Sequence, residues 1–176
     1  MNLFLLSWNV NKCAEYHCDK HVVKMVLELT QMLYTSWYMN SGGGGGHVPK
    51  SAPVCKSTGE AGYRKLSNPN HPMAKWVRAS RWNYVFTVRL ACALCLEYAH
   101  RYENRTHGCA VHVVWLAENI PPEFGSLKKT VFPTCMPDEY KRSSSPVLSY
   151  RTYYVEDKKR FAVWTNRPVP GWFLSL

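Results

Sequence analysis

The sequence has no apolar run that reaches the roughly 18 residues needed for a membrane-spanning helix. Its opening segment, MNLFLLSWNV, contains no basic residue and is too short for a secretory signal peptide. Both absences argue against a membrane protein and against export. We therefore expect a protein that acts inside the cell and has no membrane partner.

Acidic residues are scarce as well. The chain has 12 Asp and Glu against 22 Lys and Arg, which gives a formal net charge of +10 at pH 7. A domain that is this basic suits a polyanionic partner, most simply nucleic acid. The alternative is that the basic surface only keeps the protein soluble.

Cysteine is present, but the pattern of a four-cysteine zinc site is missing. Of the seven cysteines, only Cys92 and Cys95 form a CxxC pair. That pair lies in an apolar helical run, which favours small buried thiols. Because the number is odd and no export signal is present, we expect the cysteines to be reduced.

Residues 13–38 carry the clearest helical pattern in the chain. One broad face is apolar, as in a helix that packs into a core. Its members are Val22, Met25, Val26, Leu29, Met32 and Leu33. The opposite side is a narrow polar stripe, in which each residue sits about one turn above the last. Its members are His17, His21, Lys24, Glu28, Gln31 and Thr35.

This stripe places two imidazoles, an amine and a carboxylate in one row, which is typical of proton transfer, metal ligation or nucleophilic attack. The alternative is an ordinary amphipathic helix with its polar side in water. Residues 2–8 are apolar and predict a short strand or a buried extended arm that ends in a turn at 9–11. Such an arm could bring the α-amine of Met1 to the stripe, and an α-amine is partly neutral and nucleophilic near pH 7.5.

The remaining chain is predicted to be mainly helical. Pro72, after a cap at Asn70 or His71, begins a straight or kinked helix over 72–102. Near its end, Glu97 either pairs with Arg101 one turn on, which we prefer, or faces the first helix. The other expected elements are a glycine-rich mobile loop or insertion over 41–62, a helix or strand over 110–120, a loop over 121–146 and a last helix over 147–166. Together they predict a mainly α fold with a single compact domain over 1–176, built of a few long helices.

Basic and aromatic residues alternate along the second long helix. The basic members are Lys75, Arg78, Arg81, Arg89 and Arg101, and the aromatic ones are Trp76, Trp82 and Tyr84. Such a mixture suits phosphates and unstacked bases. It is equally typical of long basic side chains that lie along an apolar helix surface.

Several segments together resemble a family of small proteins from tailed phages and large DNA viruses. They are CAEYHCDKHVVKMVLELTQML, NPNHPMAKWVR, LCLEYAHRY, MPDEYK, SYRTYY and VPGWF. The resemblance covers nearly the whole chain apart from the glycine-rich segment. It implies a viral origin and a location in the cytoplasm or nucleus of an infected host, but no activity.

A second resemblance implies an activity. The apolar arm, the Glu–Leu step in a helix, the NHP tripeptide and the aromatic-basic tail look like the pyrimidine-dimer DNA glycosylases of the endonuclease V type. In that family an N-terminal amine attacks C1′ of a damaged nucleotide without a metal, and a helical Glu assists. Glu28 matches that Glu, and Tyr150–Tyr154 matches the tail. Here residue 2 is Asn, which usually keeps the initiator Met, so the resemblance implies Met1 or Lys24 as the nucleophile.

Three functions follow as hypotheses. The favoured one is a DNA glycosylase with lyase activity, which needs no cofactor and acts on duplex DNA. Its candidate catalytic residues are Met1, His17, His21, Lys24 and Glu28. Its candidate nucleic-acid-binding residues are His71, Arg78, Arg81, Arg101, Tyr150, Arg151 and Tyr154. The alternatives are a metal-dependent nuclease or hydrolase with His17 and His21 as ligands, and a non-catalytic nucleic-acid-binding or host-interaction protein.

Overall fold

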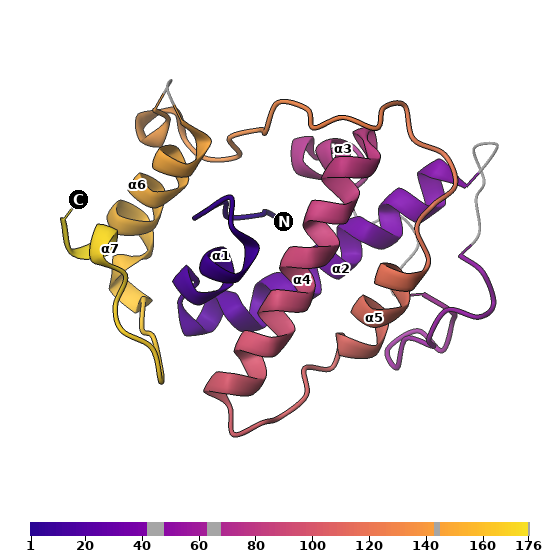
Figure 1. The fold of residues 1–176 in the computed structure, drawn as a ribbon, viewed down its shortest axis with the longest axis horizontal. Coiled ribbons are helices and arrows are strands. Elements are labelled where there is room, and N and C mark those ends of the chain that lie inside the picture. Colours follow the sequence, from indigo (N-terminus) through magenta and orange to yellow (C-terminus); the bar gives the residue numbers. More distant parts are fainter. Residues whose placement is uncertain (42–47, 63–67, 143–144, 176) are drawn as a thin grey trace.

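Helices form most of the structure, a computed structural model that describes residues 1–41, 48–62, 68–142 and 145–175 (Figure 1). The helices are α1 (Val10–Tyr16), α2 (Asp19–Asn40), α3 (Pro72–Ala79), α4 (Arg81–Arg101), α5 (Ala110–Glu118), α6 (Pro146–Lys158) and α7 (Gly171–Ser175), with short 3₁₀ turns at Asp138–Tyr140 and Lys159–Phe161. Within these ranges there is no β-strand, only isolated bridges that join Val54 to Ala61 and Gly62. The predicted mainly α, single compact domain is confirmed.

Helix α2 is the centre of the core. It packs against α3, α4 and α5, and Figure 1 shows α4 crossing in front of it. The predicted apolar face of α2 is buried throughout. Residues on its other sides, such as Thr30, Tyr34 and Trp37, are buried as well, so the helix is covered on most of its circumference. No helix within the described ranges is long and apolar enough to cross a membrane.

The predicted first helix is in fact two helices, α1 and α2, and the turn expected at 9–11 is absent. Asn9 caps α1, because its side chain accepts a hydrogen bond from the N–H of Lys12. The backbone is then extended at His17 and Cys18, with ψ of 135° and 163°, which ends α1 before α2 begins. The hydroxyl of Tyr154 accepts the backbone N–H of Cys18 at 3.1 Å, which replaces a helical hydrogen bond at the break.

The second long helix is also divided. Ser80 is extended, with φ of −150° and ψ of 154°, and its side chain accepts the N–H of Asn83 to begin α4. The Asn83 amide donates to the carbonyl of Trp76 at 2.7 Å, which ties the two helices together across the break. The predicted cap of α3 is confirmed at His71, whose Nδ1 accepts the N–H of Met73.

The N-terminal segment is a buried extended arm, the second of the two structures predicted for it, rather than a strand. Leu3, Leu5 and Leu6 have no exposed surface, and the ring of Phe4 stacks on the ring of His21 with centroids 4.5 Å apart. The arm passes from the N-terminus to the start of α1 and lies above α2 in the view of Figure 1. It therefore fixes the position of the first residues against the middle of the core.

Two other segments differ from the sequence expectation. Residues 42–47 of the glycine-rich segment lie outside the described ranges, but residues 48–62 pack on the domain and bury Val48, Ala52 and Cys55. Of the two alternatives expected for this segment, a mobile loop or an insertion, residues 48–62 therefore fit an insertion that packs on the domain. The last long helix, α6, ends at Lys158 rather than at 166, and the chain continues through a 3₁₀ turn to α7.

Candidate catalytic site at the N-terminus

A buried carboxylate on α2 lies beside the start of the chain. The Glu28 side chain is 10% exposed, and its Oε2 lies 3.9 Å from the α-amine nitrogen of Met1. The backbone N–H of Asn2 donates to the same oxygen at 2.7 Å. The ammonium of Lys24, one turn earlier on α2, is 3.3 Å from the other oxygen, Oε1. One carboxylate thus lies between the two amines that the sequence offered as nucleophiles.

The side chain of Asn2 holds this end of the arm in place. Its amide donates to the carbonyl of Cys135 at 2.9 Å, and its oxygen accepts from the hydroxyl of Tyr150 at 3.0 Å. The same hydroxyl accepts the backbone N–H of Cys135 at 3.1 Å. These contacts join the arm to the 121–137 segment and to α6. The α-amine is therefore held by the fold rather than carried on a free end.

His71 lies in the same neighbourhood. Burial lowers its pKa, the positive α-amine of Met1 lowers it further, and Glu28 acts in the opposite direction. Its Nδ1 already accepts a hydrogen bond as the cap of α3. His71 is thus a neutral imidazole near neutral pH, close enough to the carboxylate of Glu28 and the α-amine of Met1 to sense their charges. The sequence placed this residue in nucleic-acid binding; the structure places it in the cluster of Met1, Lys24 and Glu28.

The cluster has a buried side and an open side. The side chain of Met1 is 3% exposed, whereas that of Lys24 is 64% exposed. Met1 as a whole residue is only partly buried, so its exposed atoms belong to its backbone rather than to its side chain. The difference matters for the choice of nucleophile, because an amine on a held backbone reacts in a fixed geometry and a long exposed side chain does not.

The two histidines of the polar stripe do not belong to this cluster. His17 lies at the end of α1 and its Nδ1 contacts the carbonyl of Cys13 at 2.6 Å. His21 contacts the hydroxyl of Tyr154 through Nδ1 at 2.5 Å. Burial lowers the pKa of His17 to about 4 and that of His21 to about 3. Both are neutral parts of the core. The break between α1 and α2 removes His17 from the predicted stripe, whereas His21 stays on α2 with Lys24 and Glu28 and is enclosed by Phe4 and Tyr154.

The expected metal site is not assembled by the described residues either. The rings of His17 and His21 have centroids 6.5 Å apart, and each directs Nδ1 to a different partner. Within the described ranges, no group of three His, Cys, Asp or Glu side chains is arranged to hold a metal ion. The cysteines found there are free thiols, with Cys92 and Cys95 half-buried on α4.

Three predicted nucleic-acid contacts are buried in the core. The Arg101 side chain has no exposed surface, because it pairs with Glu97 at 2.7 Å, as preferred from the sequence, and with Asp19 at 2.8 Å. Tyr150 and Tyr154 are also fully buried, with their hydroxyls used inside the protein. None of these three side chains is at the surface, where a nucleic-acid phosphate could contact it. The helical spacing that suggested a basic-aromatic surface instead places these residues in the core.

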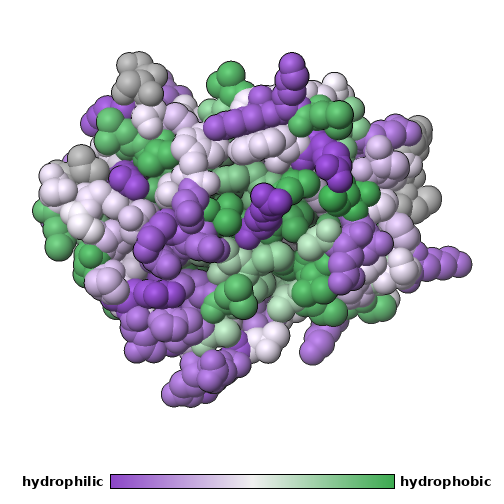
Figure 2. Space-filling view, in the orientation of Figure 1, coloured by the Kyte–Doolittle hydropathy of each residue, from purple (hydrophilic) through white to green (hydrophobic). Residues whose placement is uncertain are grey.

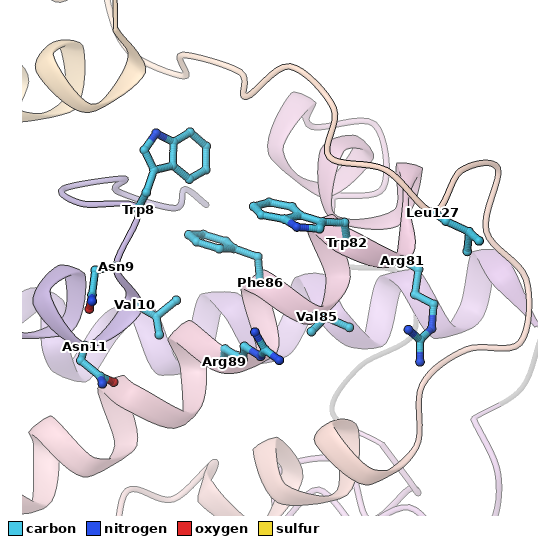
Figure 3. Close-up of a pocket in the computed structure, with 10 residues that line it drawn as sticks. All are labelled: Trp8, Asn9, Val10, Asn11, Arg81, Trp82, Val85, Phe86, Arg89 and Leu127. Carbon is cyan, nitrogen blue, oxygen red and sulfur yellow. The ribbon is translucent and has the colours of Figure 1, made fainter.

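The other three predicted contacts remain at or near the surface. Arg151 donates to the carbonyl of Leu6, and its guanidinium lies over the ring of Trp172 at 5.1 Å. Arg78 donates to the carbonyl of Pro69. Arg81 is exposed and lines a groove on α4 that does not include the N-terminal cluster (Figure 3). The predicted set is thus spread over several parts of the molecule.

Three residues that the sequence analysis did not single out have roles at the N-terminal cluster, at Glu97 and in the groove on α4. Asn2 positions the α-amine through Cys135, and Arg167 completes the pairing of Glu97 at 2.9 Å. Both contacts join residues more than 60 positions apart, so no local spacing signals them. Trp8 lines the groove and was assigned only to the apolar arm. An exposed tryptophan at the end of a buried arm is the one signal that could have identified it.

Comparisons with known proteins give no family assignment. No protein-family model matches the chain, and no match is found among the curated proteins or the solved structures.

Proposed function

We propose that the protein is a DNA-processing enzyme that acts at C1′ of a damaged or modified nucleotide, with the α-amine of Met1 as nucleophile and Glu28 as the proton-transfer group. The observation that carries this proposal is the 3.9 Å distance between the α-amine and a carboxylate oxygen of Glu28. The order expected from the glycosylase resemblance, an N-terminal amine beside a helical Glu, is the order of these two residues. The net charge of +10 supports a polyanionic substrate.

The chemistry requires a neutral amine and a nearby base. Glu28 accepts the proton that the amine loses, and the amine nitrogen then attacks C1′. On a nucleotide that still carries its base, the new C–N bond forms as the bond to the base breaks and the base leaves with a proton. The C1′–O4′ bond of this glycosylamine then breaks, O4′ takes up a proton, and the sugar ring opens. At an abasic site the amine adds to the C1′ aldehyde and a water molecule leaves. Either route gives an imine between Met1 and C1′ of the sugar.

The imine makes strand cleavage possible. It acidifies the C2′ hydrogen, and a base removes that proton while the C3′–O bond breaks and the 3′ phosphate leaves. Glu28 and the neutral imidazole of His71 are the two bases that the cluster offers for this step. Lys24 lies on the open side and is suited to attract a phosphate.

Borohydride trapping tests the proposal. The protein is mixed with duplex DNA that carries an abasic site, sodium borohydride is added, and a covalent protein–DNA product is measured with and without a chelator. We expect a trapped product that the chelator does not reduce. Peptide mapping should place the adduct on Met1, since hydride addition to the imine carbon leaves a stable secondary amine.

Two variants provide matched controls. Glu28→Gln keeps the side chain's size and should lower strand cleavage by about 100- to 10,000-fold, the usual contribution of a positioned acid–base group. Extra residues ahead of Met1 should abolish trapping, and their removal should restore it. Trapping that survives such an extension, or no trapped product with the intact chain, would refute amine chemistry at Met1.

A further inference from the structure

A groove of about 560 Å³ lies on the N-terminal half of α4, separate from the Met1–Glu28 cluster. This volume is within the range of about 300–1,000 Å³ that is usual for ligand pockets. Figure 3 shows that its lining comes from α4, from the end of the N-terminal arm and from the segment that contains Leu127. Figure 2 shows the same face, where hydrophobic and hydrophilic residues lie side by side near the centre.

Two parallel rows of side chains on α4 form the floor of the groove. Arg81, Val85 and Arg89 are spaced by four residues and make a basic row, and Trp82 and Phe86 make an aromatic row beside it. The rings of Trp82 and Phe86 are stacked, with an interplanar angle of 10° and centroids 5.4 Å apart. The helix thus presents a flat aromatic surface next to a line of positive charge.

Trp8 adds a wall at an angle to this floor. Its ring lies 6.3 Å from that of Trp82, at 63°, and 5.6 Å from that of Phe86, at 64°. Trp8 is 37% exposed and Trp82 36%, which is unusual for such large rings. Phe86 is only 6% exposed, so the accessible aromatic surface of the groove belongs mainly to Trp8 and Trp82 (Figure 3).

The positive charges of this groove are not neutralised by the protein. Within the described ranges, Arg81, Arg89 and Lys129 form no ion pair, and none of the residues that line the groove is acidic. The ammonium of Lys129 lies 3.3 Å from the ring centre of Trp8 and 5.3 Å from that of Trp82. A cation–π contact at an exposed site is weaker than the stacking of a base on an aromatic ring, so a base can displace this ammonium.

We propose that the groove binds unstacked nucleotides of a single-stranded nucleic-acid segment. Bases stack on Trp82 against the wall formed by Trp8, while Arg81, Arg89 and Lys129 contact the phosphates. From Arg81 to Arg89 the helix rises about 12 Å, so the two guanidinium groups are far enough apart to contact different phosphates of one strand. Duplex DNA fits this groove poorly, because its bases are stacked inside the helix and cannot reach the rings.

Fluorescence anisotropy with a dye-labelled ten-nucleotide single strand tests this binding, since it needs no catalysis. The same sequence as a duplex and a free nucleoside monophosphate serve as competitors. Three phosphate contacts predict a slope of about −2 in log K against log salt. The single strand should compete at least ten-fold better than the duplex or the monophosphate. Equal competition by the monophosphate would refute a strand-binding groove, and a preference for the duplex would refute binding of unstacked nucleotides.

Matched variants identify the groove as the binding site. Trp82→Leu should weaken binding at least five-fold, the lower end of the contribution of base stacking to an aromatic ring, whereas Leu96→Ala, at another exposed apolar residue of α4, should not. Arg81→Ala/Arg89→Ala should reduce the salt slope to about −0.7. The control Arg105→Ala/Arg160→Ala removes the same charge from exposed positions outside the groove and should leave the slope near −2. Equal effects of the two double variants would overturn the proposal.

This binding is independent of the proposed amine chemistry. Glu28→Gln should bind the labelled strand as tightly as the unaltered protein. The variants at Arg81 and Arg89 should still give a trapped product with Met1 when DNA is in excess. Failure of one experiment with success of the other therefore separates the groove from the catalytic cluster.

Discussion

Two buried carboxylates on neighbouring helices have opposite surroundings. Glu97 on α4 receives three hydrogen bonds from guanidinium groups, at 2.7, 2.9 and 3.1 Å, from Arg101 and Arg167. Glu28 on α2 has one short hydrogen bond, from a backbone N–H, and two amines at longer distances. Arginine cannot give up its proton and pairs with a carboxylate in a fixed planar geometry. Amines can release a proton, so only the surroundings of Glu28 suit chemistry.

The same difference holds for the groups around each carboxylate. Burial alone would raise the pKa of Glu97, but hydrogen bonds from Arg167 and Arg101 hold it below its ordinary value. Its neighbourhood also includes Asp19, which bonds to Arg101 and to Thr165. The carboxylates of Glu97 and Asp19 both accept hydrogen bonds from guanidinium groups. A saturated network of this kind stabilises a fold, whereas the partners of Glu28 are a backbone N–H and two amines.

Removal of the Glu97 charge should give the largest loss of stability. Glu97→Gln keeps the size of the side chain but leaves the buried Arg101 with Asp19 as its one remaining carboxylate partner within the described ranges. Because a broken buried ion pair costs about 3–5 kcal/mol, we expect a fall of about 3 kcal/mol in the free energy of unfolding, measured by urea denaturation.

The control for this prediction is Glu28→Gln. It should lower the free energy of unfolding by no more than about 1 kcal/mol, since a Gln oxygen can still accept the N–H of Asn2. At the same time it should remove most of the strand cleavage. If both variants destabilise the protein equally, the contrast between a structural and a chemical carboxylate is lost.

Acid pH should weaken the fold through the buried histidines at the α1–α2 break. Burial lowers the pKa of His17 to about 4, against an ordinary value of 6.5. Between pH 6.5 and 4 the unfolded chain binds a proton there that the folded protein does not, so stability falls as the pH falls. The loss is about 1.4 kcal/mol per pH unit for this residue, or about 2 kcal/mol at pH 5.

The variant His17→Phe tests this source of acid sensitivity. A phenyl ring cannot take up a proton, so the plot of unfolding free energy against pH should be flatter between pH 6.5 and 4 than that of the unaltered protein. The substitution His100→Gln, at an exposed position, serves as the control and should leave the slope unchanged. An unchanged slope in His17→Phe would show that the imidazole is accessible to protons in the folded state.

How far the sequence predicts these features depends on the distance of each contact along the chain. Helical periodicity correctly identified the apolar face of α2, the cap at His71 and the pair of Glu97 with Arg101, all of which are local. The breaks at Cys18 and Ser80 were missed, because contacts from Tyr154 and Asn83 hold them and no Pro or Gly marks them. Propensity alone cannot reveal a break that tertiary contacts impose.

The candidate site follows the same rule. Glu28 and Lys24 are one turn apart, so their proximity was predictable, whereas the contact of Glu28 with Met1 depends on how a buried arm crosses α2. The sequence placed His17 in line with Glu28 because it predicted one continuous helix, and the extended junction at His17 and Cys18 removes it from that row. His21 does lie on α2 with Glu28, but its ring packs against Phe4 and contacts the hydroxyl of Tyr154. The candidate site therefore consists of Lys24 and Glu28 on α2, His71 at the start of α3, and Met1.

The smallest expected effect concerns the second amine near Glu28. Lys24 is 64% exposed and its pairing with Glu28 resembles a surface ion pair one helical turn apart. Such pairs contribute about 0.3–0.5 kcal/mol, so Lys24→Met should change the free energy of unfolding by no more than that. If Met1 is the nucleophile, the variant should still form the borohydride-trapped product, with its affinity for DNA reduced slightly and its salt slope lower by about one phosphate contact. Trapping at saturating DNA measures the retained chemistry, and binding titrations at several salt concentrations measure the change in affinity and salt slope. Loss of the product in Lys24→Met, with the adduct mapped to Lys24 in the unaltered protein, would transfer the nucleophile to α2 and leave the α-amine of Met1 with a structural role.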